Sequence, residues 1–115
     1  CAVVHSDSGE GIQRLNQEAA KAMSGGNRAG MDISPEHAIS WITSNAAKSL
    51  GISDRTGSLE AGKMADVVIW NQNPFSVYAK ANQVFIDGAL VYDRDNPGLQ
   101  PVSDVELGQL QGVSK

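Results

Sequence analysis

The chain has 115 residues, of which 41% are hydrophobic and 19% are charged, and its formal net charge is -4. This length and composition are typical of about one globular domain, and the acidic balance, without a visible basic stripe, argues against a nucleic-acid partner. No apolar run approaches the roughly 18 residues of a membrane-spanning helix, so we expect no membrane partner.

The first eight residues, CAVVHSDS, combine an apolar run with polar chemistry. Residues 1–4 are predicted to form a buried strand, and His5, Ser6 and Asp7 follow at its tip. A carboxylate at a strand tip is a common way to present an acid, a base or a metal ligand. Because no cap or turn precedes this strand, we expect the chain to be truncated at its left edge.

The single cysteine, Cys1, permits no internal disulfide. We expect it to be a small buried apolar residue rather than a reactive thiol.

Two helices are predicted next. Apolar residues at helical spacing indicate the first over residues 11–24, and the glycine-rich stretch SGGNRAG is expected to end it. The second covers residues 34–50, with Ser34 as its N-cap, Pro35 at the first helical position and Gly51 as its C-terminal stop.

Three strands follow the helices. Residues 65–70 (ADVVIW) are rich in β-branched side chains and predict a buried strand. The segment NQVFIDGALVYD predicts a hairpin, with Asp87 and Gly88 as its turn pair. Beyond Asp93 the periodicity is lost, and we expect an extended tail. The order predicts an α/β unit followed by a small antiparallel β piece.

Three segments, in order, resemble the C-terminal part of the metal-dependent amidohydrolases, in the branch related to imidazolonepropionase and Xaa-Pro dipeptidase. HSDS is similar to the end of the eighth barrel strand, where that superfamily places an Asp. ITSNAAKSLGI is similar to a family helix, and GSLEAGKMADVVIWNQNPF is similar to the family run Gly-x-Leu-x-x-Gly-x-x-Ala-Asp-Val-Val. VFIDGALVYD then resembles the family's closing hairpin.

The resemblance implies an α/β plus small β fold: the last β/α unit of a (β/α)8 barrel, followed by the C-terminal strands of the flanking β-sandwich. On that pattern residues 1–52 belong to the barrel, residues 53–95 to the composite sandwich and residues 96–115 to the tail. It also implies that Asp7 is both a metal ligand and the base that takes a proton from the attacking water. A divalent metal lowers the pKa of bound water from about 15.7 towards about 7, and an adjacent carboxylate can accept the proton.

The chain also departs from the family pattern, which requires a His-x-His pair, a bridging Lys or a Glu, and two further histidines. Only His5 and His37 occur here, so the chain resembles a C-terminal fragment. A catalytic zinc usually takes three protein ligands. We therefore expect zinc to be the metal of the parent enzyme and not to be bound by the fragment, which is expected to be inactive alone. Its expected partners are the missing N-terminal part, further copies of itself and, in the parent, an amide or dipeptide substrate.

The remaining polar residues are predicted to have minor roles. His5 and Ser8 are candidate substrate contacts, whereas His37 is predicted to be a surface histidine. Asn45 is predicted to tie helix to loop through side-chain hydrogen bonds. Gly57 and Gly62 are predicted to bracket a tight turn, where Asp66 is expected to hydrogen-bond the backbone, and Trp41 and Trp70 are predicted to be core residues. The alternative function is a non-catalytic α+β assembly or binding module completed by another chain.

Overall fold

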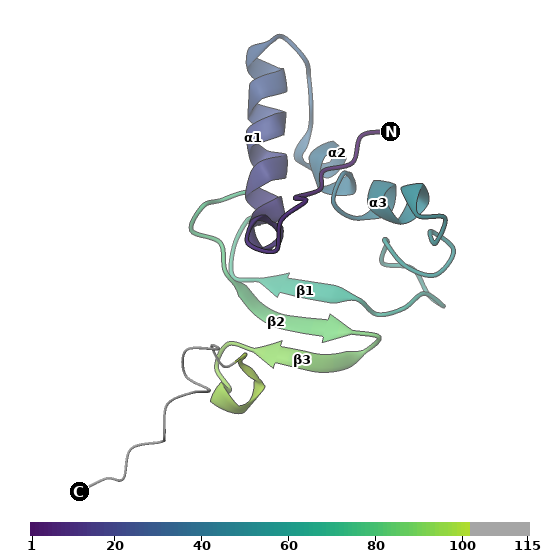
Figure 1. Ribbon diagram of the computed structural model, residues 1–115, viewed down its shortest axis with the longest axis vertical. Coiled ribbons are helices and arrows are strands. Elements are labelled where there is room, and N and C mark those ends of the chain that lie inside the picture. The colour runs from purple at the N-terminus through teal and green to yellow at the C-terminus, as the bar shows by residue number, and fades with distance from the viewer. Residues whose placement is uncertain (102–115) are drawn as a thin grey trace, which may run out of the picture.

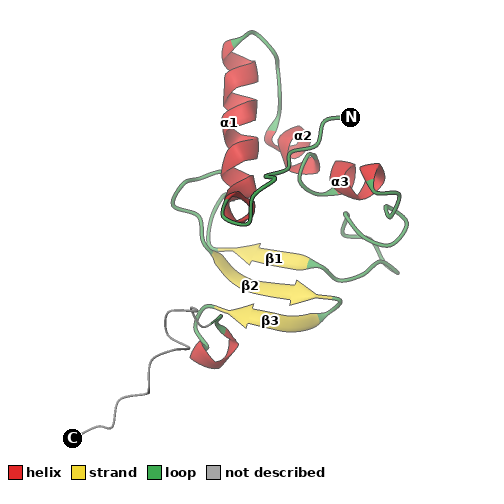
Figure 2. Cartoon of the chain, in the orientation of Figure 1, coloured by secondary structure: helices red, strands yellow, loops and turns green. Residues whose placement is uncertain are grey.

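A computed structural model describes residues 1–101, and it has a helical half and a sheet half (Figures 1 and 2). Both halves contribute to one small α/β arrangement, in which the helices lie beyond one edge of the sheet. The elements, in chain order, are the 3₁₀ helix η1 (Gly11–Arg14), α1 (Leu15–Arg28), α2 (Pro35–Ser40), α3 (Ser44–Ser49), β1 (Val67–Trp70), β2 (Ala81–Ile86), β3 (Ala89–Asp93) and the 3₁₀ helix η2 (Pro97–Leu99).

The sheet is an antiparallel meander in the order β1-β2-β3. Val68 pairs with Val84, which in turn pairs with Tyr92. The β2–β3 turn uses Asp87 and Gly88, with φ of 49° and 81°. Two consecutive positive φ values are typical of the hairpin turn that matches strand twist, so the predicted hairpin and its turn pair are confirmed.

Helix α1 is longer than the sequence predicts, because it continues through Gly25 and Gly26 to Arg28. At Gly26 a β-carbon would lie 2.5 Å from Cδ1 of Ile33. The absence of a side chain at Gly26 therefore allows Ile33 to pack closely against α1. The helix tolerates the lower helix propensity of glycine, which costs about 1 kcal/mol. The helix ends instead before Gly30, whose φ is +90°.

The helix predicted over residues 34–50 is two helices, α2 and α3. Its ends are as predicted: Ser34 accepts a hydrogen bond from the His37 amide at 3.2 Å, and Gly51 has a φ of +70°. The break lies at residues 41–43, whose amides donate to carbonyls three residues earlier. Hydroxyls of Ser40 and Thr43 donate to nearby helix carbonyls, and such bonds compete with helical ones and bend helices.

The predicted N-terminal strand is wrong. Residues 1–6 are irregular, and Cys1 is exposed rather than buried. The segment is held by the Val4 amide, which donates to the Trp41 carbonyl at 3.2 Å, and by Asn45, whose Nδ2 donates to the Ala2 carbonyl at 2.9 Å. A strand requires a neighbouring strand whose backbone groups pair with its own N–H and C=O groups. No strand among the described residues pairs with residues 1–6. Asn45 has the structural role that the sequence predicts.

The core is small and lies between α1 and α2. Its buried members are Ala19, Ala38 and Trp41, with Phe75 from the sheet half packed against them. Among the described residues no large side chain is fully buried. The strand at residues 65–70, predicted to be buried, is largely exposed, because nothing described covers Val68 and Ile69, which are 43% and 44% exposed.

The predicted extended tail, residues 96–115, is described only in its first part. Residues 97–99 form the 3₁₀ helix η2, and residues 102–115 lie outside the described part of the chain. Within residues 1–101 no helix has the length and apolarity that a membrane span needs.

Candidate functional site

Asp7 lies in the exposed loop that joins the N-terminal segment to η1. Its φ is +50°, a region that Asp and Asn enter more readily than most residues. Nδ1 of His5 lies 3.1 Å from Oδ1 of Asp7, and the two side chains are 72% and 88% exposed. The structure therefore brings these two predicted site residues together, although not on a strand.

The chemistry of the two side chains decides which of them donates the hydrogen bond. An ionised carboxylate only accepts hydrogen bonds. We therefore assign the proton of the His5 ring to Nδ1, which donates to Asp7 and leaves Nε2 as the accepting nitrogen when the ring is neutral. The second oxygen of Asp7 has no partner among residues 1–101 and can take a ligand or a proton.

Ser8 caps the turn that follows Asp7. Its Oγ accepts from the amides of Glu10 and Gly11 at 3.2 and 3.1 Å, as serine hydroxyls do in turns. It also lines a polar hollow of about 520 Å³, together with Glu10, Gln13, Arg14 and Glu18.

The described residues do not form a metal centre on their own. Nowhere in residues 1–101 do three His, Cys, Asp or Glu side chains gather closely enough to hold a metal ion. The carboxylate of Asp7 suits a hard divalent cation or zinc as one ligand. The second histidine, His37, instead meets the Trp41 ring edge-on at a centroid distance of 5.6 Å.

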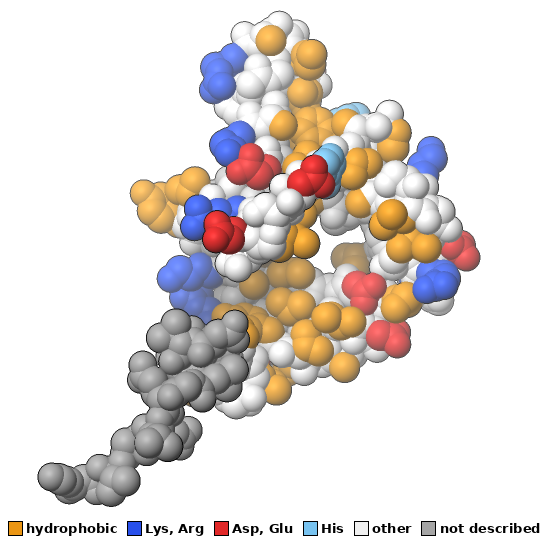
Figure 3. Space-filling view, viewed as in Figure 1, with side chains coloured by type: hydrophobic (Ala, Val, Ile, Leu, Met, Phe, Trp, Pro, Cys, Tyr) orange, Lys and Arg blue, Asp and Glu red, His pale blue; other side chains and the backbone are white. Residues whose placement is uncertain are grey.

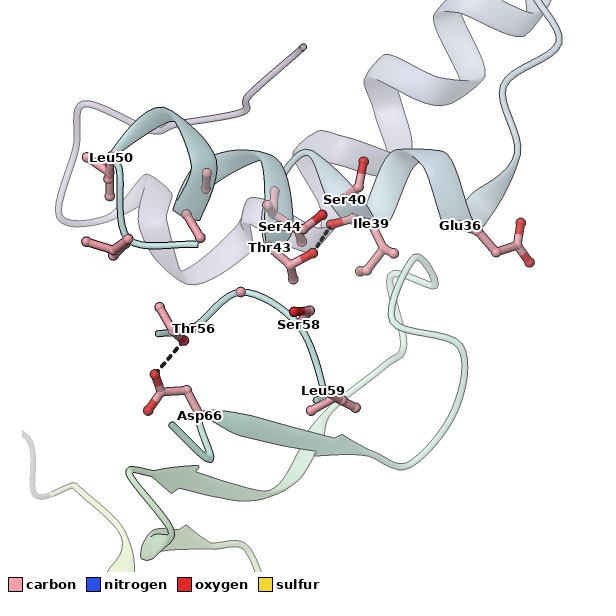
Figure 4. Close-up of a pocket in the computed structure, with 15 residues that line it drawn as sticks. Glu36, Ile39, Ser40, Thr43, Ser44, Leu50, Thr56, Ser58, Leu59 and Asp66 are labelled. Carbon is pink, nitrogen blue, oxygen red and sulfur yellow. Dashed lines mark hydrogen bonds between the residues drawn. The ribbon is translucent and has the colours of Figure 1, made fainter. Parts of the chain in front are cut away.

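A larger cavity, of about 620 Å³, lies between the two halves of the molecule (Figure 4). Helices α2 and α3 form one wall, and residues 56–59 with Asp66 form the other. Figure 3 shows the same region as a hollow between the helical half and the sheet. Its lining is Glu36, Ile39, Ser40, Ile42, Thr43, Ser44, Ala46, Ala47, Leu50, Ile52, Thr56, Gly57, Ser58, Leu59 and Asp66.

Asp66 stabilises the floor of this cavity. Its Oδ1 accepts from the Asp87 amide at 2.9 Å, and its Oδ2 accepts from Thr56 Oγ1 at 2.8 Å. These two bonds, the backbone one first, hold the pKa of the Asp66 carboxyl below its ordinary value. The predicted role of Asp66 in hydrogen bonding to the backbone is confirmed. Sequence reasoning missed the cavity itself, because its walls, residues 36–52 and 56–66, approach each other only in the folded chain.

Three comparisons with known proteins agree on one family. A profile of the amidohydrolase family matches residues 3–91. Imidazolonepropionase from Shewanella oneidensis is 54% identical over 39 residues, which are 34% of this chain and 10% of that protein. Imidazolonepropionase from Thermoplasma volcanium is 38% identical over 68 residues, which are 54% of this chain and 17% of that protein.

A solved structure gives the same result. The crystal structure of an amidohydrolase from Thermotoga maritima MSB8 superposes with a TM-score of 0.59 and 40% identity, over 69% of this chain and 19% of that one. The matched part of the chain thus spans about a tenth to a fifth of the length of these relatives.

Proposed function

The chain belongs to the amidohydrolase family, and from that premise we propose that it is the C-terminal part of a metal-dependent hydrolase that cleaves C–N bonds. The observation that carries the proposal is the continuous family match over residues 3–91, joined to a structural neighbour of which the chain covers 19%. The imidazolonepropionase matches favour a cyclic amide, an amide or a peptide-like bond as the substrate class.

The architecture of the chain supports the assignment to a larger enzyme. The buried core consists of small side chains and one tryptophan, whereas a self-sufficient domain buries several large ones. Among the described strands, β1 and β3 each pair on one side only, and unpaired edges are usually covered in a complete sheet. Both features are expected of a part that packs against further chain.

We assign the segments as the family pattern implies. Residues 1–52 contribute the last β/α segment of the barrel, residues 53–95 contribute strands of the composite β-sandwich, and residues 96–115 form the tail. The division at residue 53 is supported by the change from helices to the β1-β2-β3 meander. In this assignment residues 1–4 become a strand only when a neighbouring barrel strand pairs with them.

Asp7 is proposed to be a metal ligand and the proton acceptor of the intact site. Its exposure and its unshared oxygen support this role. A divalent metal, which we propose to be zinc, would lower the pKa of a bound water when present. His5 is proposed to orient the Asp7 carboxylate, a role supported by the 3.1 Å contact between them. His5 and Ser8 are proposed to contact the substrate. The described residues supply too few ligands to hold a metal by themselves. We therefore propose that this chain alone does not catalyse the reaction.

A chimeric enzyme tests the proposal. The segment of the Thermotoga maritima amidohydrolase that superposes on this chain would be replaced by the matching residues of this chain. A purified chimera that binds metal and hydrolyses amides supports the proposal. A chimera that folds and binds metal but hydrolyses none of the amides accepted by the unmodified enzyme contradicts it, and favours the alternative of a non-catalytic assembly module.

A further inference from the structure

The loop that carries Asp7 is anchored on both sides. Before the loop, the Val4 amide donates to the Trp41 carbonyl at 3.2 Å, which joins this segment to the end of α2. After Asp7, the Ile12 amide donates to the Ser8 carbonyl at 3.0 Å, which joins the loop to η1. Asp7 therefore lies between two backbone positions, Val4 and Ser8, that hydrogen bonds to neighbouring elements hold in place.

Ser6 closes the loop around Asp7. Its Oγ donates to the Ser8 carbonyl at 2.9 Å and accepts from the Ser8 amide at 3.3 Å. One hydroxyl thus contacts both backbone groups of the residue that directly follows Asp7. Ser6 is partly buried, whereas the Asp7 side chain is 88% exposed. Within residues 1–101 the hydrogen bonds of the Ser6 hydroxyl therefore act on the backbone beside Asp7 and not on its carboxylate.

The backbone of Asp7 has a conformation that needs this support. Its φ of +50° lies in the left-handed region, which is unfavourable for a residue with a side chain and persists where the surrounding structure holds it. The turn is also tightly packed, because a β-carbon at Gly11 would lie 3.2 Å from Cβ of Ser6 and 3.5 Å from Cβ of Ser8. Ser6, Ser8 and Gly11 together leave the chain little room to relax around Asp7.

We propose that Ser6 is a positioning residue for Asp7. Its hydroxyl holds the left-handed backbone at Asp7, and the direction of the Cα–Cβ bond, and with it that of the carboxylate, follows from this backbone conformation. The inference rests on the role proposed for Asp7 in the intact enzyme. A carboxylate that is directed before the substrate binds does not have to be ordered during the reaction, and a small misplacement of a reacting group lowers the rate.

Nuclear Overhauser spectroscopy on the full 115-residue chain tests the geometry. A positive φ brings the amide proton and the α-proton of one residue close together, so this signal should be stronger for Asp7 than for His5 and Ser8. Ser6→Ala should reduce the Asp7 signal to the level of these neighbours, and Ser6→Thr, which keeps the hydroxyl, should preserve it. An Asp7 signal that is unchanged in Ser6→Ala would overturn the proposal.

Ser49→Ala is the matched control. The Ser49 hydroxyl also donates to a nearby backbone carbonyl, that of Ala46 at 2.8 Å, but it does so at the end of α3. Its removal costs a hydrogen bond of the same kind and should leave the Asp7 signal unchanged. A loss of the Asp7 signal in both alanine variants would mean that the loop responds to general destabilisation, and would contradict a specific role for Ser6.

The chimeric enzyme tests the consequence for catalysis. Ser6→Ala should lower kcat by about 10- to 100-fold with little change in KM, because the carboxylate is misdirected while the substrate contacts remain. Ser6→Thr should recover most of this loss, and Ser49→Ala should cause none. If Asp7→Asn lowers turnover and Ser6→Ala does not, the positioning role is wrong and the proposed function stands. If neither substitution lowers turnover, the role proposed for Asp7 is wrong as well.

Discussion

Nδ2 of Asn16 donates a 2.6 Å hydrogen bond to the carbonyl oxygen of Pro74, across 58 positions of sequence. Asn16 lies in α1 and is only 8% exposed, whereas Pro74 lies in the β1–β2 loop. The bond therefore joins the helical half to the sheet half beside the small core, where Phe75 packs against Ala19 and Trp41.

Asn16→Ala should lower the free energy of unfolding by about 1–3 kcal/mol, because it removes a partly buried hydrogen bond and leaves the Pro74 carbonyl without its partner. Urea denaturation followed by circular dichroism measures the change. Gln13→Ala, at an exposed position one turn earlier, serves as the control and should change stability by less than about 0.5 kcal/mol. Equal effects of the two substitutions would show that the two halves are not joined through Asn16.

Gly57 is the second point where the two halves meet. Its φ is +92°, and a β-carbon there would collide with Cβ of Ala47 and lie 3.3 Å from Cα of Ser44. Gly62 has nearly the same φ, +91°, with nothing within 4 Å of its β-carbon position. Gly62→Ala is thus a matched control for Gly57→Ala that carries the backbone strain without the collision.

Gly62→Ala should cost about 1 kcal/mol of stability from backbone strain, and Gly57→Ala about 2–4 kcal/mol, because the collision adds to it. Urea denaturation of both variants measures the difference. If the two costs are the same, α3 does not pack against residues 56–59 as the structure has it.

The lowered pKa of Asp66 makes stability depend on pH. The bonds from the Asp87 amide and from Thr56 favour the ionised carboxylate in the folded state. Because the folded pKa lies below the ordinary value of 3.8, this contribution is present above pH 3.8 and is lost as the pH falls below it. Asp66→Asn should therefore be less stable than the unmodified chain near neutral pH, and the difference should shrink under acid.

Thermal unfolding between pH 7 and pH 3 checks this sign. Asp54→Asn, at an exposed position between α3 and Gly57, is the control and should follow the unmodified chain at every pH. A difference for Asp66→Asn that grows as the pH falls would contradict the assigned hydrogen bonds.

Asp7→Asn tests the proposed chemistry in the chimeric enzyme. An amide cannot accept the proton that the carboxylate is proposed to take, so turnover should fall by about 100-fold or more. Metal content, measured on the same samples, separates loss of a ligand from loss of the base. Asp54→Asn removes an exposed carboxylate that lines neither hollow and should leave turnover unchanged; equal losses from both substitutions would contradict the role proposed for Asp7.

Local chemistry predicts some of this fold well. Ser34 caps α2, and Asp87 with Gly88 forms the β2–β3 turn, because the geometry of a cap or a tight turn depends on a few adjacent residues. The start and end of the helical segment at residues 34–51 follow for the same reason.

Other features depend on segments that are distant in sequence. Residues 1–4 have strand composition, but a strand forms only where a neighbour pairs with it, and none of the described strands does. The length of α1 depends on Ile33 packing against Gly26. The contact of His5 with Asp7 joins side chains only two residues apart, whereas the cavity above Asp66 was not predictable, since residues 36–50 and 56–66 approach only in the folded chain.

Native mass spectrometry of the purified 115-residue chain, with and without added zinc, tests most directly the central claim that its site is incomplete. We expect single or self-associated chains that take up no stoichiometric zinc, and no hydrolysis of amides or dipeptides by the same sample. One tightly bound zinc per chain together with amide turnover would contradict this claim, because the site would then be complete within these residues.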